Sequence, residues 1–125
     1  MNIESLLQAI STDLAQVDGV NTSKLGLEEA PNESDYPLVR IVPVRLSQET
    51  NSSGSRELEV HIYYGDTINN QTTLQQVYIT NCQLERHIDE RMRNGQWLAM
   101  NKQTEMQYEA QPEQKLFRST YSLHI

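Results

Sequence analysis

Residues 57–64 constrain the fold most, because apolar and polar side chains alternate through the whole segment. A period of two places the apolar set on one face of an extended strand and the polar set on the other. The segment therefore predicts a strand with one buried face, which requires neighbouring strands and a covering layer. The two sets are Leu58, Val60, Ile62 and Tyr64 on one face, and Glu57, Glu59, His61 and Tyr63 on the other.

Three more segments have the composition of strands. Residues 38–46 are rich in β-branched side chains, and Pro43 among them indicates an edge strand or a bulge. Residues 48–55 are polar and contain Gly and Ser, which is typical of a hairpin loop between the first two strands. Residues 104–110 and 116–125 alternate as well. The last segment places its apolar side chains on one face: Phe117, Tyr121, Leu123 and Ile125.

The N-terminal residues have the pattern of an amphipathic helix. Asn2 suits the N-cap and Gly19 suits the end, so we expect the helix to run between them. Residues 21–35 have little periodicity, many acidic and turn-forming residues and Pro31, which together indicate a surface excursion. The helical stripe occupies an arc about 100° wide. It consists of Ile3, Leu6, Leu7, Ile10, Leu14 and Val17.

A second helix is predicted in the middle of the chain. Thr72 or Thr73 begins it as a capping box with the glutamine three residues later, and Asn94 with Gly95 ends it. Asn81 lies inside the apolar arc, where a buried amide needs hydrogen-bond partners. Cys82 lies beside that arc and suits a small buried side chain. The apolar stripe consists of Leu74, Val77, Leu84, Ile88 and Met92.

The predicted order of elements is helix, strand, strand, helix, strand, strand. Short polar loops join both strand pairs, so we expect an antiparallel sheet of about four main strands with the two helices on one face, an α+β fold. A chain of 125 residues is the usual size of one domain, and no repeat or linker divides it. We therefore predict a single domain over residues 1–125.

Charge and cysteine content limit the partners. The formal net charge is −7, and residues 1–35 hold one lysine against seven acidic residues, which gives −6 for that third of the chain. Such a surface repels a polyphosphate, so we expect no sequence-specific nucleic-acid binding. Cys82 is the only cysteine, and no segment resembles a signal peptide or a membrane span. These features indicate a protein of the reducing cytoplasm with no membrane partner.

The sequence contains no recognisable catalytic constellation. His61, His87 and His124 have no second histidine or cysteine at metal-ligand spacing, and His87 lies five residues after Cys82, which is not a facing distance on a helix. Phosphate-binding loops and nucleophile elbows are also missing from the sequence. We therefore predict no catalytic, metal or cofactor site and no enzyme activity.

Several residues are candidates for contacts with a partner protein. Adjacent tyrosines in a strand point to opposite faces, so at least one of Tyr63 and Tyr64 lies off the main core face. The alternative is that a loop covers it. Trp97 is either a core lid or a contact residue, and the polar loops at 48–55 and 65–72 are too polar for the core. The candidate interface residues are Tyr63, Tyr64, Trp97, Asn51, Ser52, Ser53, Gly54, Asn69 and Asn70.

Four strings of the sequence carry a family resemblance. They are YPLVRIVPVRL (36–46), RELEVHIYYGD (56–66), LERHIDERM (84–92) and MQYEAQPEQKLFRSTYSLHI (106–125). In this order they resemble the tail terminator proteins of long-tailed, lambda-like bacteriophages. The likeness covers most of the chain after Asp35 and contains no catalytic signature. The loops at 47–55 and 94–103 depart from the family, so residues that contact the tail tube are not carried over.

The resemblance implies a structural role. A tail terminator forms a hexameric ring on the last ring of the tail tube, stops tube growth and offers the surface that receives the head. Its expected partners are other copies of itself, the tail tube protein and a head completion or connector protein, first in the host cytoplasm and then in the virion tail. A head-to-tail connector or neck protein is the alternative. A small cytoplasmic enzyme or a nucleic-acid accessory protein is a more distant one.

Overall fold

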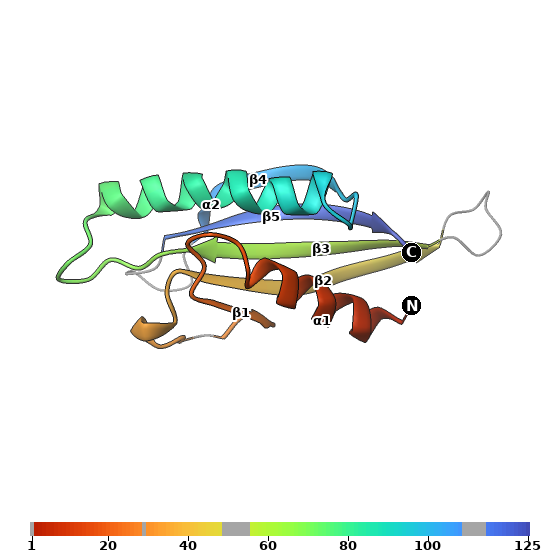
Figure 1. The fold of residues 1–125 in the computed structure, drawn as a ribbon, viewed down its shortest axis with the longest axis horizontal. Helices are drawn as coiled ribbons and strands as arrows, with labels where there is room; N and C mark the ends of the chain where they lie inside the picture. Colours follow the sequence, from red (N-terminus) through yellow and green to blue (C-terminus); the bar gives the residue numbers. More distant parts are fainter. Residues whose placement is uncertain (1, 29, 49–55, 109–114) are drawn as a thin grey trace.

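The structure is a computed structural model, which describes residues 2–28, 30–48, 56–108 and 115–125. Its strands form a five-stranded sheet in the spatial order β1-β2-β3-β5-β4 (Figure 1). The α+β class agrees with the sequence prediction, but the sheet is mixed and has one strand more than predicted. The strands are β1 (Thr22–Leu25), β2 (Leu38–Gln48), β3 (Arg56–Gly65), β4 (Met100–Tyr108) and β5 (Leu116–His124).

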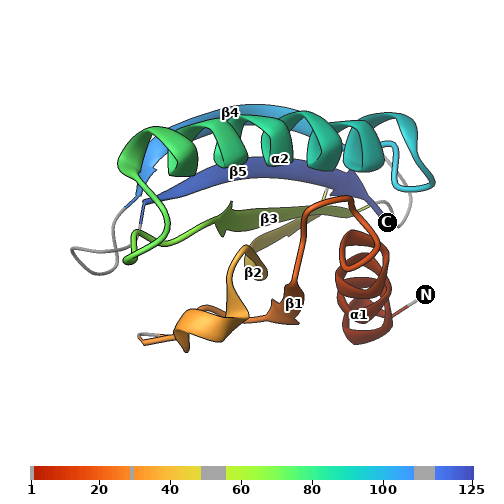
Figure 2. The ribbon, with the colours of Figure 1, turned by 60° about the vertical axis from the view of Figure 1, so that its left-hand side comes forward.

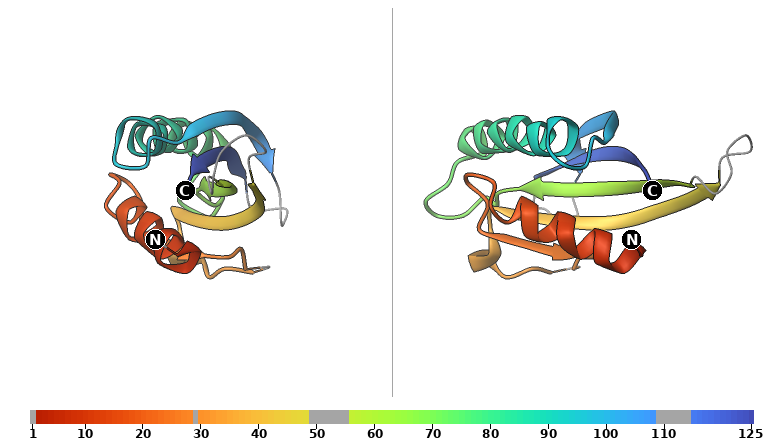
Figure 3. Two further views of the ribbon diagram at one scale, coloured as in Figure 1. Left: turned by 90° about the vertical axis from the view of Figure 1, so that its right-hand side faces the viewer. Right: turned by 45° about the vertical axis from the view of Figure 1, so that its right-hand side comes forward.

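Two α-helices, α1 (Ile3–Leu14) and α2 (Leu74–Asn94), cover one face of the sheet. Helix α1 lies over β1 and β2, and α2 lies over β3, β5 and β4. Figures 2 and 3 show both helices on the same side of a curved sheet, near its opposite edges. A short 3-10 helix, η1 (Glu33–Asp35), lies between β1 and β2 in the chain. No helix among the described residues is long and apolar enough to span a membrane.

The predicted helix starts are confirmed. Asn2 caps α1 by accepting a hydrogen bond from the backbone N–H of Ser5 at 2.8 Å. Thr73 and Gln76 form the capping box of α2, each side chain accepting from the backbone of the other. These bonds satisfy N–H groups that have no partner within the helix.

The predicted helix ends are correct for α2, which stops at Gly95, and wrong for α1. Helix α1 ends at Leu14 rather than near Gly19. The N–H groups of Gln16 and Val17 bond to carbonyls three residues back, which tightens the chain into 3-10-like turns. Val17 still faces the core through these turns, and this explains why the apolar pattern continued past the helix.

The segment predicted as a surface excursion contains β1 and η1. Strand β1 pairs with β2 in parallel, with Thr22 opposite Leu38 and Leu25 opposite Ile41, so the expectation of a wholly antiparallel sheet is wrong. Four residues with no alternation give no sequence signal for a strand. The tie that holds β1 is a buried side chain of β2: Arg40 donates to Thr22 Oγ1 at 3.0 Å and to Glu28 at 2.7 Å.

Strand β2 confirms the prediction made from Pro43. β1 covers only the first four residues of β2, so from Val42 onward β2 is an edge strand with one neighbour, β3. The register with β3 also shifts between Pro43 and Arg45, which is a bulge. A proline has no N–H to donate, and this position requires none on its outer side.

The main core lies between the sheet and the helices. The predicted stripes meet there, with Val60, Ile62 and Tyr64 of β3 and Phe117 and Tyr121 of β5 facing the helices. Two predictions for α2 are wrong, because Leu74 and Cys82 are exposed. The buried residues of α2 are Val77, Asn81, Leu84, Ile88 and Met92.

Asn81 has the partners that its place in the apolar arc requires. The residue is fully buried, its Oδ1 accepts from the backbone N–H of Asp66 at 3.0 Å, and its Nδ2 donates to the carbonyl of Lys115. Gly65, at φ +153°, passes so close that a Cβ there would lie 2.9 Å from the amide of Asn81. One side chain thus joins α2 to the end of β3 and the start of β5.

Replacing Asn81 with alanine should lower the free energy of unfolding by about 1–3 kcal/mol, because it leaves a partly buried N–H and a partly buried carbonyl without their partner. Urea denaturation followed by circular dichroism measures this change. Gln83→Ala, on the exposed side of the same helix, is the control and should leave the midpoint nearly unchanged. Equal midpoints for Asn81→Ala and Gln83→Ala would show that the amide does not tie these elements together.

Candidate functional site

The two tyrosines proposed as contact residues are both inside the subunit. Tyr64 is fully buried, donates or accepts a hydrogen bond with Ser119 Oγ at 2.8 Å and meets Phe117 edge to face. Tyr63 lies on the other face of β3, as the alternation predicts, but it packs into a small cluster with Leu38 and Leu116. Both rings are therefore buried within the subunit, and Tyr63 is the one that lies off the main core face, as the alternation predicts.

Trp97 closes one end of the core. Its ring packs against the main core cluster, and its Nε1–H donates to Asp13 Oδ2 at 2.8 Å. The other oxygen of Asp13 accepts from Arg91 of α2. Asp13 therefore links α1 to both α2 and the turn that follows α2, and Trp97 is a core lid in this arrangement.

The polar loop candidates divide into two groups. Asn51, Ser52, Ser53 and Gly54 lie outside the described residues. Asn69 and Asn70 lie in the turn before α2, where Asn69 Oδ1 accepts from the N–H of Gln71 at 2.7 Å and Asn70 is exposed. Asn69 thus shapes its own turn, and only Asn70 of this pair is a well-exposed polar side chain.

The sheet face opposite the helices carries a network of ion pairs. Lys102 of β4 lies 3.2 Å from Glu57 and 3.1 Å from Glu59, and Arg45 of β2 lies 3.3 Å from Glu59. The network thus spans β2, β3 and β4, although β5 separates β3 from β4 in the sheet. Arg118 of β5 pairs with Glu105 on the same face.

The pairing fixes the protonation of these carboxyl groups. The hydrogen bond from Ser122, then that from Lys102, lowers the pKa of Glu57, and the hydrogen bond from Lys102 lowers that of Glu59. The bond from Arg118 lowers the pKa of Glu105. A general acid or base requires a pKa near the working pH, so these carboxylates act as permanent charges. The face is a paired, solvated surface.

The three histidines lie on three different elements, and Cys82 shares α2 with His87. His61 lies on β3, where burial and then the nearby Arg118 lower its pKa. His87 lies on α2 and His124 ends β5. Within the described part of the chain, no three His, Cys, Asp or Glu side chains are grouped so that they could hold a metal ion.

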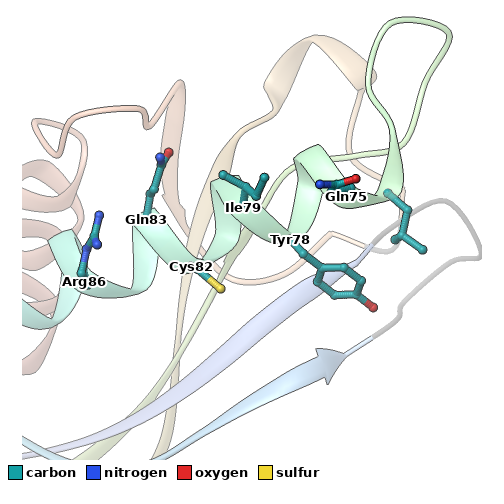
Figure 4. A pocket seen from close by; sticks show the side chains of 7 residues that line it. Gln75, Tyr78, Ile79, Cys82, Gln83 and Arg86 are labelled. Atoms are coloured by element: carbon teal, nitrogen blue, oxygen red, sulfur yellow. The ribbon is translucent and has the colours of Figure 1, made fainter.

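An apolar groove that is open to solvent runs along α2. The groove encloses about 680 Å³. Figure 4 shows two rows of side chains along it, with Tyr78 and Cys82 in one row and Gln75, Ile79, Gln83 and Arg86 in the other. Leu74 completes the lining at the start of the helix. We call this surface the α2 groove.

The sequence contained a signal for the α2 groove that the predicted stripe left out. Successive helical residues are rotated by about 100°, so Ile79 points away from both Val77 and Asn81, which are buried. An apolar residue opposite the buried arc marks a second apolar face. Ile79 is 50% exposed and Leu74 is 44% exposed, which is unusual for such large apolar side chains within one contiguous surface.

Other exposed apolar residues lie near the two edges of the sheet. Leu98 follows α2, is 77% exposed and has a φ of +49°, in the left-handed region that side chains with a Cβ rarely occupy. The remaining residues are Met100 and Met106 on β4, Leu25 on β1, and Val44 and Leu46 on β2.

Comparison with known proteins adds no family to this description. The chain matches no protein-family model, and it matches no curated protein. The exposed surfaces themselves therefore carry the functional argument.

The ion-pair network predicts how stability changes with pH. The pKa of Glu59 is lower in the folded state, so its ion pairs stabilise the fold above about pH 4.5, its ordinary value, and are lost as the pH falls through the folded value. As the pH falls from about 4.5 through the folded pKa of Glu59, the urea midpoint of the parent should decrease. Glu59→Gln should make the urea midpoint less dependent on pH in this range. Glu33→Gln, an exposed residue elsewhere, is the control. Identical pH profiles for Glu59→Gln and the parent would contradict the assignment.

Proposed function

We propose that this protein is a structural subunit that assembles into a closed ring, the tail terminator of a long-tailed bacteriophage. The observation that carries the proposal is that exposed apolar side chains occupy two different surfaces near opposite edges of one sheet. One surface belongs to β1, with Leu25. The other belongs to α2, with Leu74 and Ile79.

Two unlike surfaces favour head-to-tail association. A two-fold dimer uses the same patch on both subunits, whereas a subunit with two complementary patches joins its neighbour in one repeated direction. Such a contact closes into a ring when the rotation between subunits closes, and otherwise it forms a filament. The two exposed apolar surfaces are therefore consistent with the ring that the family resemblance implies. The number of six subunits comes from that resemblance alone.

The edges of the sheet favour contacts through side chains over a continuous intersubunit sheet. Pro43 and a bulge interrupt the free edge of β2, and β4 has register shifts between Asn101 and Gln103 and between Glu105 and Tyr108. Prolines, bulges and charged residues at edges are the usual protection against uncontrolled strand pairing. A ring subunit requires such protection, because edge pairing would let assembly continue beyond closure.

We propose the tail tube protein and a head protein as partners because four strings of the sequence resemble tail terminators. The ring would bind the last ring of tail tube protein and present its other face to a head completion or connector protein. It would act in the host cytoplasm and remain in the virion tail. The acidic surface is compatible with a channel for DNA, because it offers a polyanion few partners.

The proposal predicts concentration-dependent assembly and a specific effect on tubes. Light scattering at rising protein concentration should show a shift from monomer to one larger species, and electron microscopy should show closed rings. Added to polymerising tail tube protein, the chain should shorten the tubes and appear at their ends. A chain that stays monomeric and leaves tube length unchanged would refute the function, and rings that bind only a head connector would indicate the neck protein.

A further inference from the structure

We infer that the α2 groove of one copy is the docking site for the β1 side of the next copy, with Leu25 as the apolar anchor. The inference rests on the proposed function, because it assigns the surfaces that join neighbouring subunits of the ring. It follows from four properties of the described residues: the lining of the α2 groove, the charges on each side, their positions along the molecule and the repulsion that a symmetric contact would create.

The α2 groove requires an apolar occupant with an acidic neighbour. Leu74, Tyr78 and Ile79 provide an apolar surface, and the glutamines beside them are neutral. Among the described residues that line the groove, Arg86 is the one charged side chain, and it forms no ion pair with another described residue. An apolar side chain in the groove with a carboxylate next to it would satisfy both features.

The β1 side of the molecule has these two features. Leu25 is 42% exposed at the end of β1. Residues 18–35 contain one lysine and five acidic residues, which gives a net charge of −4. Glu28 pairs with Arg40 at 2.7 Å and with Lys24 at 3.9 Å, and Asp35 lies 4.0 Å from Arg40, so these two carboxylates are balanced within the subunit. The exposed carboxylate of Glu33 has no ion-pair partner among the described residues. The β1 side therefore offers an exposed leucine and one uncompensated described carboxylate, which are complementary to the groove with Arg86.

The two surfaces lie at matching positions. Figure 1 shows the first half of α2 and the β1–η1 segment at the same end of the long axis, near opposite edges of the sheet. The end-on view in Figure 3 places α2 and β1 at the two extremes of the cross-section. Stacking a second copy beside the first therefore brings β1 of one towards α2 of the other without a shift along the axis.

A symmetric contact between two α2 grooves is disfavoured. A two-fold arrangement would place the Arg86 of one copy near the Arg86 of the other within an apolar surface, and like charges in such a surface are costly. It would also leave Leu25 and the acidic segment without a role. A head-to-tail arrangement instead joins opposite charges at every interface of the ring.

The single native cysteine allows a direct test, because Cys82 lines the α2 groove. Leu25→Cys, treated with a short bis-maleimide cross-linker, should give a ladder of covalent oligomers that ends at the ring. Leu46→Cys is the matched control: Leu46 is also at the β1–β2 edge and is 41% exposed, but it lies towards the other end of β2. The parent and the control should give no ladder, and Cys82→Ser in the Leu25→Cys background should abolish it.

The concentration dependence of assembly, measured on a second set of variants, provides an independent test. Ile79→Glu should shift assembly to at least tenfold higher concentration, while Met106→Glu, an equally exposed site on β4, should have a much smaller effect. Arg86→Glu should weaken assembly at low salt, and adding Glu33→Lys should restore part of it. Circular dichroism confirms that each variant is folded.

The outcomes separate this inference from the proposed function. If the parent forms rings but Leu25→Cys gives no ladder and Ile79→Glu assembles normally, the docking assignment is wrong and the ring remains. Cross-linking of the parent through Cys82 alone would establish the symmetric contact and overturn the inference. If neither rings nor cross-links form at any concentration or with tubes, both proposals fail.

Discussion

The structure depends on β3, the strand that has neighbours along its whole length on both edges. Its apolar face forms the centre of the core, with Val60, Ile62 and Tyr64 fully buried under the helices. A slip of one residue would turn that face outward and place Glu59 and His61 in the core, so the register of the sheet is strongly fixed. The position of every other element, including both proposed contact surfaces, follows from this register.

The sequence correctly predicted those features of the fold that depend on interactions between neighbouring residues. The caps at Asn2 and Thr73, the stop at Gly95 and the alternation in β3 each depend on a few adjacent residues. Asn81 is an example in which the sequence predicted only part of the answer. Because its amide lies inside an apolar arc, it requires hydrogen-bond partners, but the sequence did not indicate which groups these are. The partners, at Asp66 and Lys115, depend on tertiary packing.

The errors occurred where tertiary contacts override local preference. β1 has four residues and no periodicity, and it exists because β2 offers a free edge and Arg40 holds it. Leu74 and Cys82 appeared buried because a helical wheel does not show where the sheet ends. Tyr64 is buried for a reason that the sequence did contain, since it faces the core in any structure that keeps the alternation of β3.

Rigid coupling between the two contact surfaces determines whether repeated association closes. A flexible joint between them would let the angle vary and would permit open chains of subunits. Here α2 is tied to the sheet by Asn81 and by the bond from Tyr121 to Asp89, at 2.7 Å, while β1 is tied to it by the buried Arg40. Both surfaces are therefore fixed to the same sheet, and in the proposed ring the curvature of that sheet would set the angle between successive subunits. A fixed angle of this kind is the physical condition for a ring of one size.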